Sequence, residues 1–122
     1  MKRNIPFTTI QDLNRNSAGK KVVLFGAGPI SEKTFRLLAG KKVHSIVDNA
    51  PNLWKKIELN VEILPPESIK GKDDLFIIIC TTSFSEVTDQ LDSFGLTSGV
   101  DYCVSPILND LRIISELESV SK

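Results

Sequence analysis

Short apolar runs recur along the chain at regular intervals and predict the strands of a sheet. Each run has the length and the β-branched or aromatic content that are typical of a buried strand. The clearest runs are residues 21–25, 43–47, 75–80 and 101–104. A weaker run at 61–63 alternates apolar and polar residues with the preceding 57–59, which predicts one short strand at the edge of the sheet.

The segments between these runs predict helices. Apolar positions recur at helical spacing in 30–39 and in 84–94, and a glycine follows each segment as a natural C-terminal stop. Ser83 precedes the second helix, and Glu86 comes three residues after Ser83, which is the pattern of a capping box.

Three further helical segments are predicted nearer the ends of the chain and in its middle. Thr8 or Thr9 can cap a short helix that runs to about residue 15, and the prolines at 65–66 open a single turn. Pro106 opens a last helix to about residue 120, whose apolar residues occupy two rows. Two rows predict docking onto a neighbouring domain or self-association, and one broad buried face is the alternative.

Strands that alternate with helices predict an α/β fold with right-handed crossovers. We expect a Rossmann-like parallel sheet of about five strands in the order 3-2-1-4-5, with helices on both faces. The whole chain, 1–122, is expected to form one domain, with a lead-in at 1–19, a core at 20–105 and a C-terminal helix at 106–122. Such a sheet opens a crevice at the carboxyl ends of its first and fourth strands.

The strongest functional signal is the loop Gly26-Ala27-Gly28-Pro29-Ile30, which joins the first strand to its helix. Gly26 permits a sharp turn, Gly28 permits a close backbone approach, and the helix start offers N–H groups to an anion. Ser31 stands where the dinucleotide fingerprint has a third glycine, and Pro29 removes one N–H donor. Two interpretations stay open: the loop contacts a nucleotide-type ligand, or it only turns the chain.

An acidic residue closes the second strand at the position that binds ribose in dinucleotide sites. Asp48 follows Gly28 by 20 residues, and Asp48 with Asn49 also suits a turn. The two roles are compatible, and an acid here favours NAD or a nucleoside-type ligand over NADP. Residues 81–83, which are Thr81, Thr82 and Ser83, follow the fourth strand and are expected at the same crevice.

Composition excludes several classes of function. Fifteen basic residues balance fifteen acidic ones, so the chain has no electrostatic footprint for nucleic acid or an anionic membrane. The apolar run 75–80 is too short to span a bilayer, and no apolar signal core follows Met1. Cys80 and Cys103 lie in apolar runs and fit buried, reduced thiols, which favours a cytoplasmic setting.

The sequence predicts no catalytic set and no metal site. His44 begins the second strand away from the crevice, Tyr102 has no lysine four positions later, and Ser83 has no neighbouring base. Two distant cysteines and one histidine do not form a metal-binding pattern. A non-catalytic binding module is therefore the first hypothesis. An NAD-dependent oxidoreductase subunit that borrows its active site is the second, and a scaffold without a ligand is the third.

The ordered set of motifs resembles a known family. The segments that carry the resemblance are Phe25-Gly26-Ala27-Gly28, Val47-Asp48-Asn49-Ala50-Pro51, Ile63-Leu64-Pro65-Pro66-Glu67 and Ile77-Ile78-Ile79-Cys80. They look like the small Rossmann-like modules fused to bacterial sugar C-methyltransferases, FkbM-type methyltransferases, glycosyltransferases and sugar N-acyltransferases. The resemblance implies binding of a nucleotide or nucleotide-sugar beside a catalytic domain, or an architectural role, and it implies no defined reaction.

Overall fold

A computed structural model of the chain describes residues 8–38 and 40–109. The described part holds the following helices, 3₁₀ helices (η) and strands, in chain order: α1 (Ile10–Asn16), β1 (Lys21–Phe25), α2 (Pro29–Leu37), β2 (Val43–Val47), η1 (Pro51–Leu53), β3 (Ile57–Glu58), β4 (Val61–Leu64), η2 (Pro66–Ile69), β5 (Leu75–Ile79), α3 (Phe84–Ser93) and β6 (Tyr102–Val104). Residues 107–109 are also helical. The rest of the predicted C-terminal helix, with its docking surface, lies outside the described residues.

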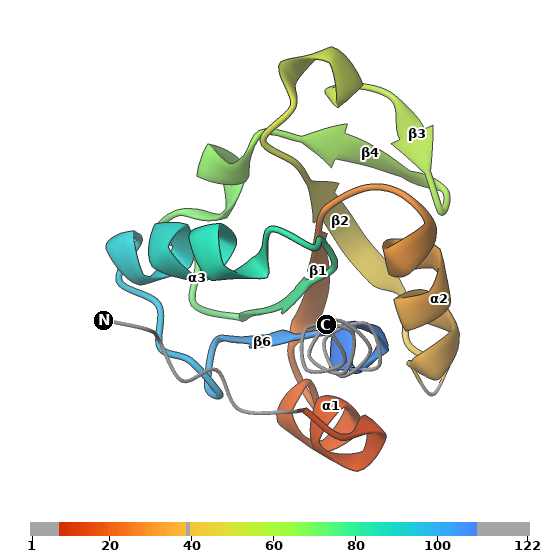
Figure 1. Cartoon of the computed structure of the whole chain (residues 1–122), viewed down its shortest axis with the longest axis vertical. Coiled ribbons are helices and arrows are strands. Elements are labelled where there is room, and N and C mark those ends of the chain that lie inside the picture. The colour runs from red at the N-terminus through yellow and green to blue at the C-terminus, as the bar shows by residue number, and fades with distance from the viewer. Residues whose placement is uncertain (1–7, 39, 110–122) are drawn as a thin grey trace, which may run out of the picture.

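The strands form one mixed, mostly parallel sheet in the order β3-β4-β2-β1-β5-β6 (Figure 1). Every neighbouring pair is parallel except β3 and β4, which are antiparallel. Phe25 at the end of β1 lies beside Val47 of β2 and Ile79 of β5. The carboxyl ends of these three strands therefore meet at one edge of the sheet, and the loops that follow them meet there too.

The α/β class is confirmed, but the predicted five-stranded sheet with the order 3-2-1-4-5 is wrong at one edge, where a sixth strand is added. Leu59 and Asn60 have φ values of +52° and +64° and form a tight turn. This turn folds β3 back on β4, so 57–63 is a hairpin and not one strand. Two-residue hairpin turns of this kind usually contain Asn, Asp or Gly. The sequence did not predict the hairpin, because leucine is unusual at the first position of such a turn.

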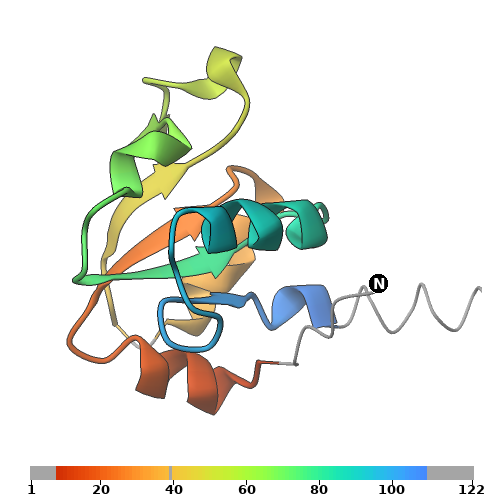
Figure 2. The ribbon, with the colours of Figure 1, turned by 90° about the vertical axis from the view of Figure 1, so that its left-hand side faces the viewer.

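Helices cover both faces of the sheet, with α3 on one side and α1 on the other (Figure 2). Val23 of β1 packs in the apolar cluster that contains Leu91 of α3. Its neighbour Val22 packs in a second cluster, which contains Leu13 of α1 and Phe35 of α2. All five residues of β5 are buried, as expected for a strand that helices cover on both faces. The two clusters together hold the carboxyl edge of the sheet in place.

The helix caps agree with the sequence analysis at α1 and differ from it at α3. The Thr9 hydroxyl accepts the N–H of Asp12 at 3.0 Å and caps α1 as predicted. The capping box predicted for Ser83 and Glu86 is wrong, because the Ser83 side chain makes no cap hydrogen bond. Ser83 has φ −81° and ψ 37°, outside the extended backbone region that N-capping requires. Its N–H instead donates to the Thr81 hydroxyl at 3.2 Å.

Candidate functional site

A hollow of about 300 Å³ lies at the carboxyl edge of the sheet, where β1, β2 and β5 end. Its walls come from the glycine loop after β1, the turn after β2, and the segment between β5 and α3. The structure brings together five of the residues that the sequence proposed for binding: Gly26, Asp48, Asn49, Thr81 and Ser83.

The other five proposed residues, Ala27, Gly28, Pro29, Ile30 and Thr82, lie outside this lining. Pro29 and Thr82 are exposed, whereas Ile30 packs against both apolar clusters. The glycine loop therefore contributes only its first residue to the hollow. Its helical end lies beside the wall, at the start of α2.

Four lining residues were missed by the sequence analysis: Phe25, Ala50, Glu86 and Val87. Glu86 was considered only as half of a capping box, although it lies in the first turn of α3 and lines the same hollow as Ser83. A helix that begins at the carboxyl edge of a sheet exposes its first turn to that crevice. That rule is the signal that could have identified Glu86 and Val87.

Asp48 anchors the glycine loop to the end of β2. Its carboxylate accepts the N–H of Ala27 at 2.9 Å through Oδ2 and the N–H of Ala50 at 2.8 Å through Oδ1. Its carbonyl oxygen accepts the indole N–H of Trp54 at 2.7 Å. The predicted turn role of Asp48 is confirmed by the bond to Ala50, which lies two residues further on. Each carboxylate oxygen has a second lone pair, so Asp48 lines the hollow as an oriented acceptor.

The next N–H group of the loop is also occupied by a carboxylate of the chain itself. Glu58 of β3 accepts the N–H of Gly28 at 3.1 Å through Oε2, and the Ser31 hydroxyl is a second acceptor of the same N–H at 3.2 Å. The Ser31 hydroxyl donates to the Gly28 carbonyl at 2.7 Å and lies 3.4 Å from the same Glu58 oxygen. Pro29 has no N–H to offer. The sequence analysis missed Glu58, because only the hairpin brings β3 beside the start of α2.

The two loop glycines serve different structural purposes. At Gly26, where φ is +112°, an added Cβ would lie 3.0 Å from the carbonyl oxygen of Cys80. At Gly28, where φ is +138°, an added Cβ would meet no atom within 4 Å. Within the chain, the close backbone approach is therefore at Gly26 and not at Gly28. Position 28 requires glycine because its backbone conformation is accessible almost only to glycine.

A pair of amide side chains joins the turn after β2 to α3. Asn49 Nδ2 donates to Gln90 Oε1 at 2.9 Å, and Gln90 Nε2 donates to Asn49 Oδ1 at 3.0 Å. Asn49 was proposed as a ligand contact, and here its amide is bonded to α3 instead.

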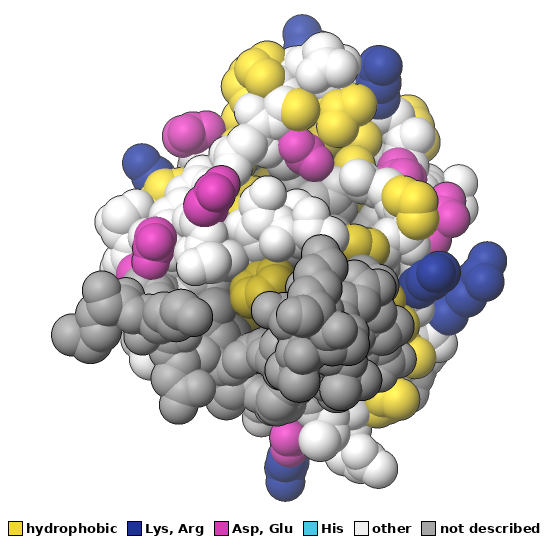
Figure 3. All heavy atoms as spheres, in the orientation of Figure 1, with side chains coloured by type: hydrophobic (Ala, Val, Ile, Leu, Met, Phe, Trp, Pro, Cys, Tyr) yellow, Lys and Arg dark blue, Asp and Glu magenta, His cyan; other side chains and the backbone are white. Residues whose placement is uncertain are grey.

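The lining of the hollow is acidic. Asp48 and Glu86 line it, and none of its lining residues is a lysine or an arginine. Asp89 and Asp92 are also exposed on α3, and acidic side chains are spread over this side of the molecule (Figure 3). Like charges repel across a few ångströms, so the lining disfavours a phosphate inside the hollow. Its hydroxyl and carboxylate oxygens suit a neutral group that carries hydroxyls.

The thiol nearest to this edge is not a nucleophile. Burial raises the pKa of the Cys80 thiol to about 12, and it raises the pKa of the Cys103 thiol to about 12 as well. Because the thiolate is the reactive form, neither cysteine reacts readily at neutral pH. The prediction of two buried, free cysteines is confirmed. Within 8–38 and 40–109, no group of three or more His, Cys, Asp and Glu residues could hold a metal ion.

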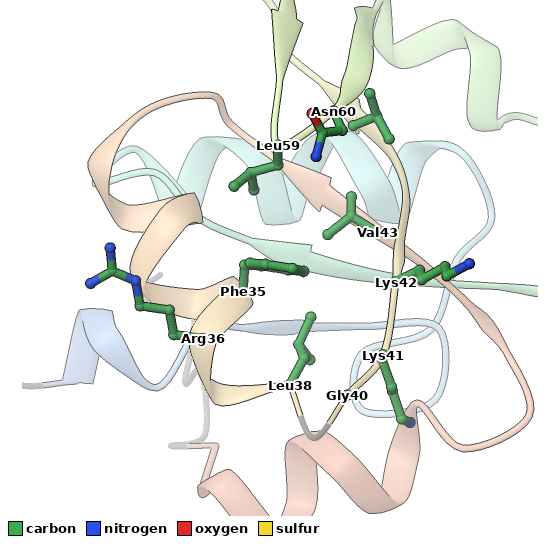
Figure 4. A pocket seen from close by; sticks show the side chains of 10 residues that line it. Phe35, Arg36, Leu38, Gly40, Lys41, Lys42, Val43, Leu59 and Asn60 are labelled. Carbon is green, nitrogen blue, oxygen red and sulfur yellow. The ribbon is translucent and has the colours of Figure 1, made fainter.

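A second hollow, of about 610 Å³, lies between the end of α2, the start of β2 and the hairpin turn. Phe35, Leu38, Val43 and Leu59 point into it from these three elements (Figure 4). Lys41 also lines it, and its ammonium group donates to the hydroxyl of Ser17, the residue that follows α1, at 2.6 Å. Open space therefore lies between the hairpin turn and α2, although Leu59 and Phe35 both pack against the second apolar cluster.

Comparisons of the chain with protein-family models, with curated proteins and with solved structures find no match. The resemblance to the modules of bacterial sugar-modifying enzymes stays a prediction. None of the described helices has the length and apolar character that crossing a membrane would need.

Proposed function

We propose that this chain is a Rossmann-like, non-catalytic binding module for a nucleotide or a nucleotide-sugar, acting in the cytoplasm beside a catalytic domain of a carbohydrate-modifying system. The observation that carries the proposal is the hollow at the carboxyl edge, with Asp48 held at its wall by two backbone N–H groups. Ligands of doubly wound sheets bind at this edge, where the chain changes direction across the sheet. β1 lies between β2 and β5, which is the arrangement that such a change of direction produces.

The size and the polarity of the hollow favour a nucleoside-sized group inside it. Its volume of about 300 Å³ lies at the small end of the range for ligand sites. In our proposal Asp48 accepts hydrogen bonds from ribose or sugar hydroxyls, and the hydroxyls of Thr81 and Ser83 face the same group. The phosphates would lie outside the acidic lining, toward Gly28 and the start of α2, where the helix dipole favours an anion.

A binding role is favoured over a catalytic one by the residues that line the hollow. They include no histidine, lysine or cysteine, and both oxygens of the Asp48 carboxylate already accept backbone N–H groups. General acid–base or nucleophilic chemistry needs a base or an activated nucleophile within hydrogen-bond reach of the reacting group. A scaffold without a ligand is the second candidate, because carboxylates of the chain already occupy the N–H groups of Ala27 and Gly28.

A thermal-shift screen tests the proposal. The ligands are NAD, UDP-, dTDP- and CDP-sugars, and coenzyme A, each at millimolar concentration. A ligand at 100 times its Kd adds about 2.7 kcal/mol to the free energy of unfolding, which shifts Tm by several degrees. A Tm that no ligand raises would reject the binding function and favour the scaffold.

A pair of variants assigns the binding to the carboxyl-edge hollow. Asp48→Asn removes the charge that would hold the sugar hydroxyls and keeps one oxygen as an acceptor for the loop. We expect it to reduce the ligand-induced shift by more than half. Glu62→Gln alters an exposed carboxylate of β4 outside the hollow and should leave the shift unchanged. Equal shifts in both variants would place the ligand elsewhere.

A further inference from the structure

Two carboxylates occupy neighbouring N–H groups of the glycine loop, and the chain holds them differently. Asp48 accepts from Ala27, and its other carboxylate oxygen and its carbonyl accept further bonds from the turn after β2. Glu58 accepts the N–H of Gly28, and it lies in a strand of two residues at the edge of the sheet. Asp48 is therefore part of a rigid turn, whereas Glu58 depends on the position of the hairpin.

The strand that carries Glu58 lies at the open edge of the sheet. β3 pairs only with β4, and Ile57 in β3 is 69% exposed. Hydrophobic side chains lie at the surface of this end of the molecule (Figure 3). The turn at Leu59 and Asn60 borders the hollow of about 610 Å³ beside α2 (Figure 4). β4 is held by its pairing with β2, and Leu59 and Val61 pack against the second apolar cluster. The displacement that costs least free energy is therefore that of β3, which has one open side.

The Glu58 carboxylate lies where an anionic ligand would bind at the start of α2. Gly28 is the N-cap residue of this helix, and the positive end of the helix dipole stabilises an anion there. A phosphate that accepted the Gly28 N–H would lie within a few ångströms of the carboxylate that accepts it now. Two such anions repel each other strongly when they are partly shielded from water.

We propose that Glu58 is an internal competitor for the phosphate of the bound nucleotide, so that a phosphate-bearing ligand displaces the Glu58 carboxylate, and with it the edge strand β3, from α2. The inference rests on the function proposed above and adds how its site is regulated. A nucleoside without phosphate fills the hollow while Glu58 stays on Gly28. A nucleoside diphosphate binds with β3 released from α2, which couples occupancy of the site to the position of the exposed Ile57.

Calorimetric titration of Glu58→Ala tests the competition. The probes are UDP and ADP, each compared with its nucleoside, uridine or adenosine. Removal of a competing charge-assisted hydrogen bond should tighten binding of the accepted diphosphate about tenfold or more. The Kd of the matching nucleoside should change less than twofold. Glu62→Ala, in the same hairpin and exposed, is the matched control and should bind both probes as the unmodified protein does.

Amide hydrogen exchange measured by NMR gives a readout without ligand. The Ser31 hydroxyl also accepts the Gly28 N–H at 3.2 Å, so the variants are compared in a Ser31→Ala background. There Glu58→Ala should make the Gly28 amide exchange at least several-fold faster, while the Ala27 amide, bonded to Asp48, should keep its rate. Glu62→Ala should change neither rate. An unchanged Gly28 rate when Glu58→Ala is added to Ser31→Ala would show that the Glu58 contact is absent in solution and would overturn the inference.

The failure of the inference can be told apart from the failure of the function. If the unmodified protein and Glu58→Ala bind the diphosphate with the same Kd, the competition is wrong and the binding function stands. If neither protein binds any of the four probes or the ligands of the thermal-shift screen, both proposals are rejected. Tighter diphosphate binding without a change for the nucleoside supports both.

Discussion

Thr34 and Ser105 share a hydrogen bond of 2.5 Å between their hydroxyl oxygens, although 71 residues separate them along the chain. Both side chains are fully buried. The Thr34 hydroxyl also donates to the carbonyl of Ile30 at 2.7 Å, and the Ser105 hydroxyl accepts the N–H of Ile107 at 3.2 Å. Because the Thr34 hydroxyl uses its proton in the bond to the Ile30 carbonyl, the Ser105 hydroxyl is the donor in the bond between the two side chains. This chain of hydroxyls joins α2 to the residue that follows β6.

Thr34→Val should lower the free energy of unfolding by about 1–3 kcal/mol, because it leaves the buried Ser105 hydroxyl without its acceptor. Valine keeps the shape of threonine, so packing changes little. Urea denaturation measures the loss. Adding Ser105→Ala to Thr34→Val should recover part of it, since the stranded hydroxyl is then gone. A loss below about 0.5 kcal/mol in Thr34→Val would contradict the role given to this bond.

Gly26→Ala should destabilise the protein more than Gly28→Ala. Both positions have a positive φ that costs an L-residue about 1–3 kcal/mol. Only Gly26 adds a close contact, because its new Cβ would lie 3.0 Å from the Cys80 carbonyl oxygen. We expect a further loss of about 1 kcal/mol or more at Gly26, measured by urea denaturation. Equal losses would mean that backbone strain alone accounts for both glycines.

Alanine at Thr9, which precedes α1, should lower the free energy of unfolding more than alanine at Ser83, which precedes α3. Thr9→Ala removes a hydroxyl that accepts an N–H at 3.0 Å and should cost about 1 kcal/mol. Ser83→Ala removes a side chain that makes no cap bond and should cost less than about 0.5 kcal/mol. Thermal unfolding of the two variants side by side checks the difference. A larger loss for Ser83→Ala would restore the capping box that the sequence suggested.

Stability should fall in alkaline solution because of the buried thiols. Burial raises the pKa of Cys80 and of Cys103 from 9.0 to about 12, whereas the unfolded chain keeps the ordinary value. Between these two pKa values the unfolded state has lost protons that the folded state retains, so the free energy of unfolding decreases as pH rises. At pH 10 the loss is about 1.4 kcal/mol per thiol, and it is absent well below pH 9.

Urea denaturation at pH 8 and pH 10 measures this loss. The variant with Cys80→Ala and Cys103→Ala should lose less stability between the two pH values than the unmodified protein. Ionisation of lysine and tyrosine affects both proteins equally, and comparing the change with pH cancels the packing cost of the substitutions. The same change with pH in both proteins would mean that the thiols do not contribute.

The central strands could be predicted because burial alone determines them. Lys21–Phe25 and Val43–Val47 have the bounds that their apolar runs predicted, and β5 differs from its run by one residue. The end of α3 could also be predicted, because a local property of glycine determines it. Gly95 has φ +84°, a value that glycine adopts without strain, and its N–H donates to the Asp92 carbonyl at 3.0 Å.

The missed features depend on contacts between segments far apart in the chain. Glu58 reaches Gly28 only because a left-handed Leu59 reverses the chain, and leucine gives no local signal for such a turn. Ser83 matches the capping pattern in composition, but its backbone angles follow the crossover from β5 to α3 and not its own preference. Five of the nine residues that line the hollow were predicted from their positions after the strands, whereas the partners of the loop N–H groups were not.

The complete burial of β5 has a consequence for the unfolded protein. Residues 75–80 form an uncharged run of β-forming residues without proline or glycine, the composition of segments that aggregate into cross-β fibrils. The native sheet prevents this by placing β5 between β1 and β6, so that neither of its edges is open. Lys72, Asp73 and Asp74 precede the run, and their charges oppose the stacking of identical strands from different molecules. Unfolding that persists at high protein concentration should therefore end in precipitation, with this segment as its nucleus.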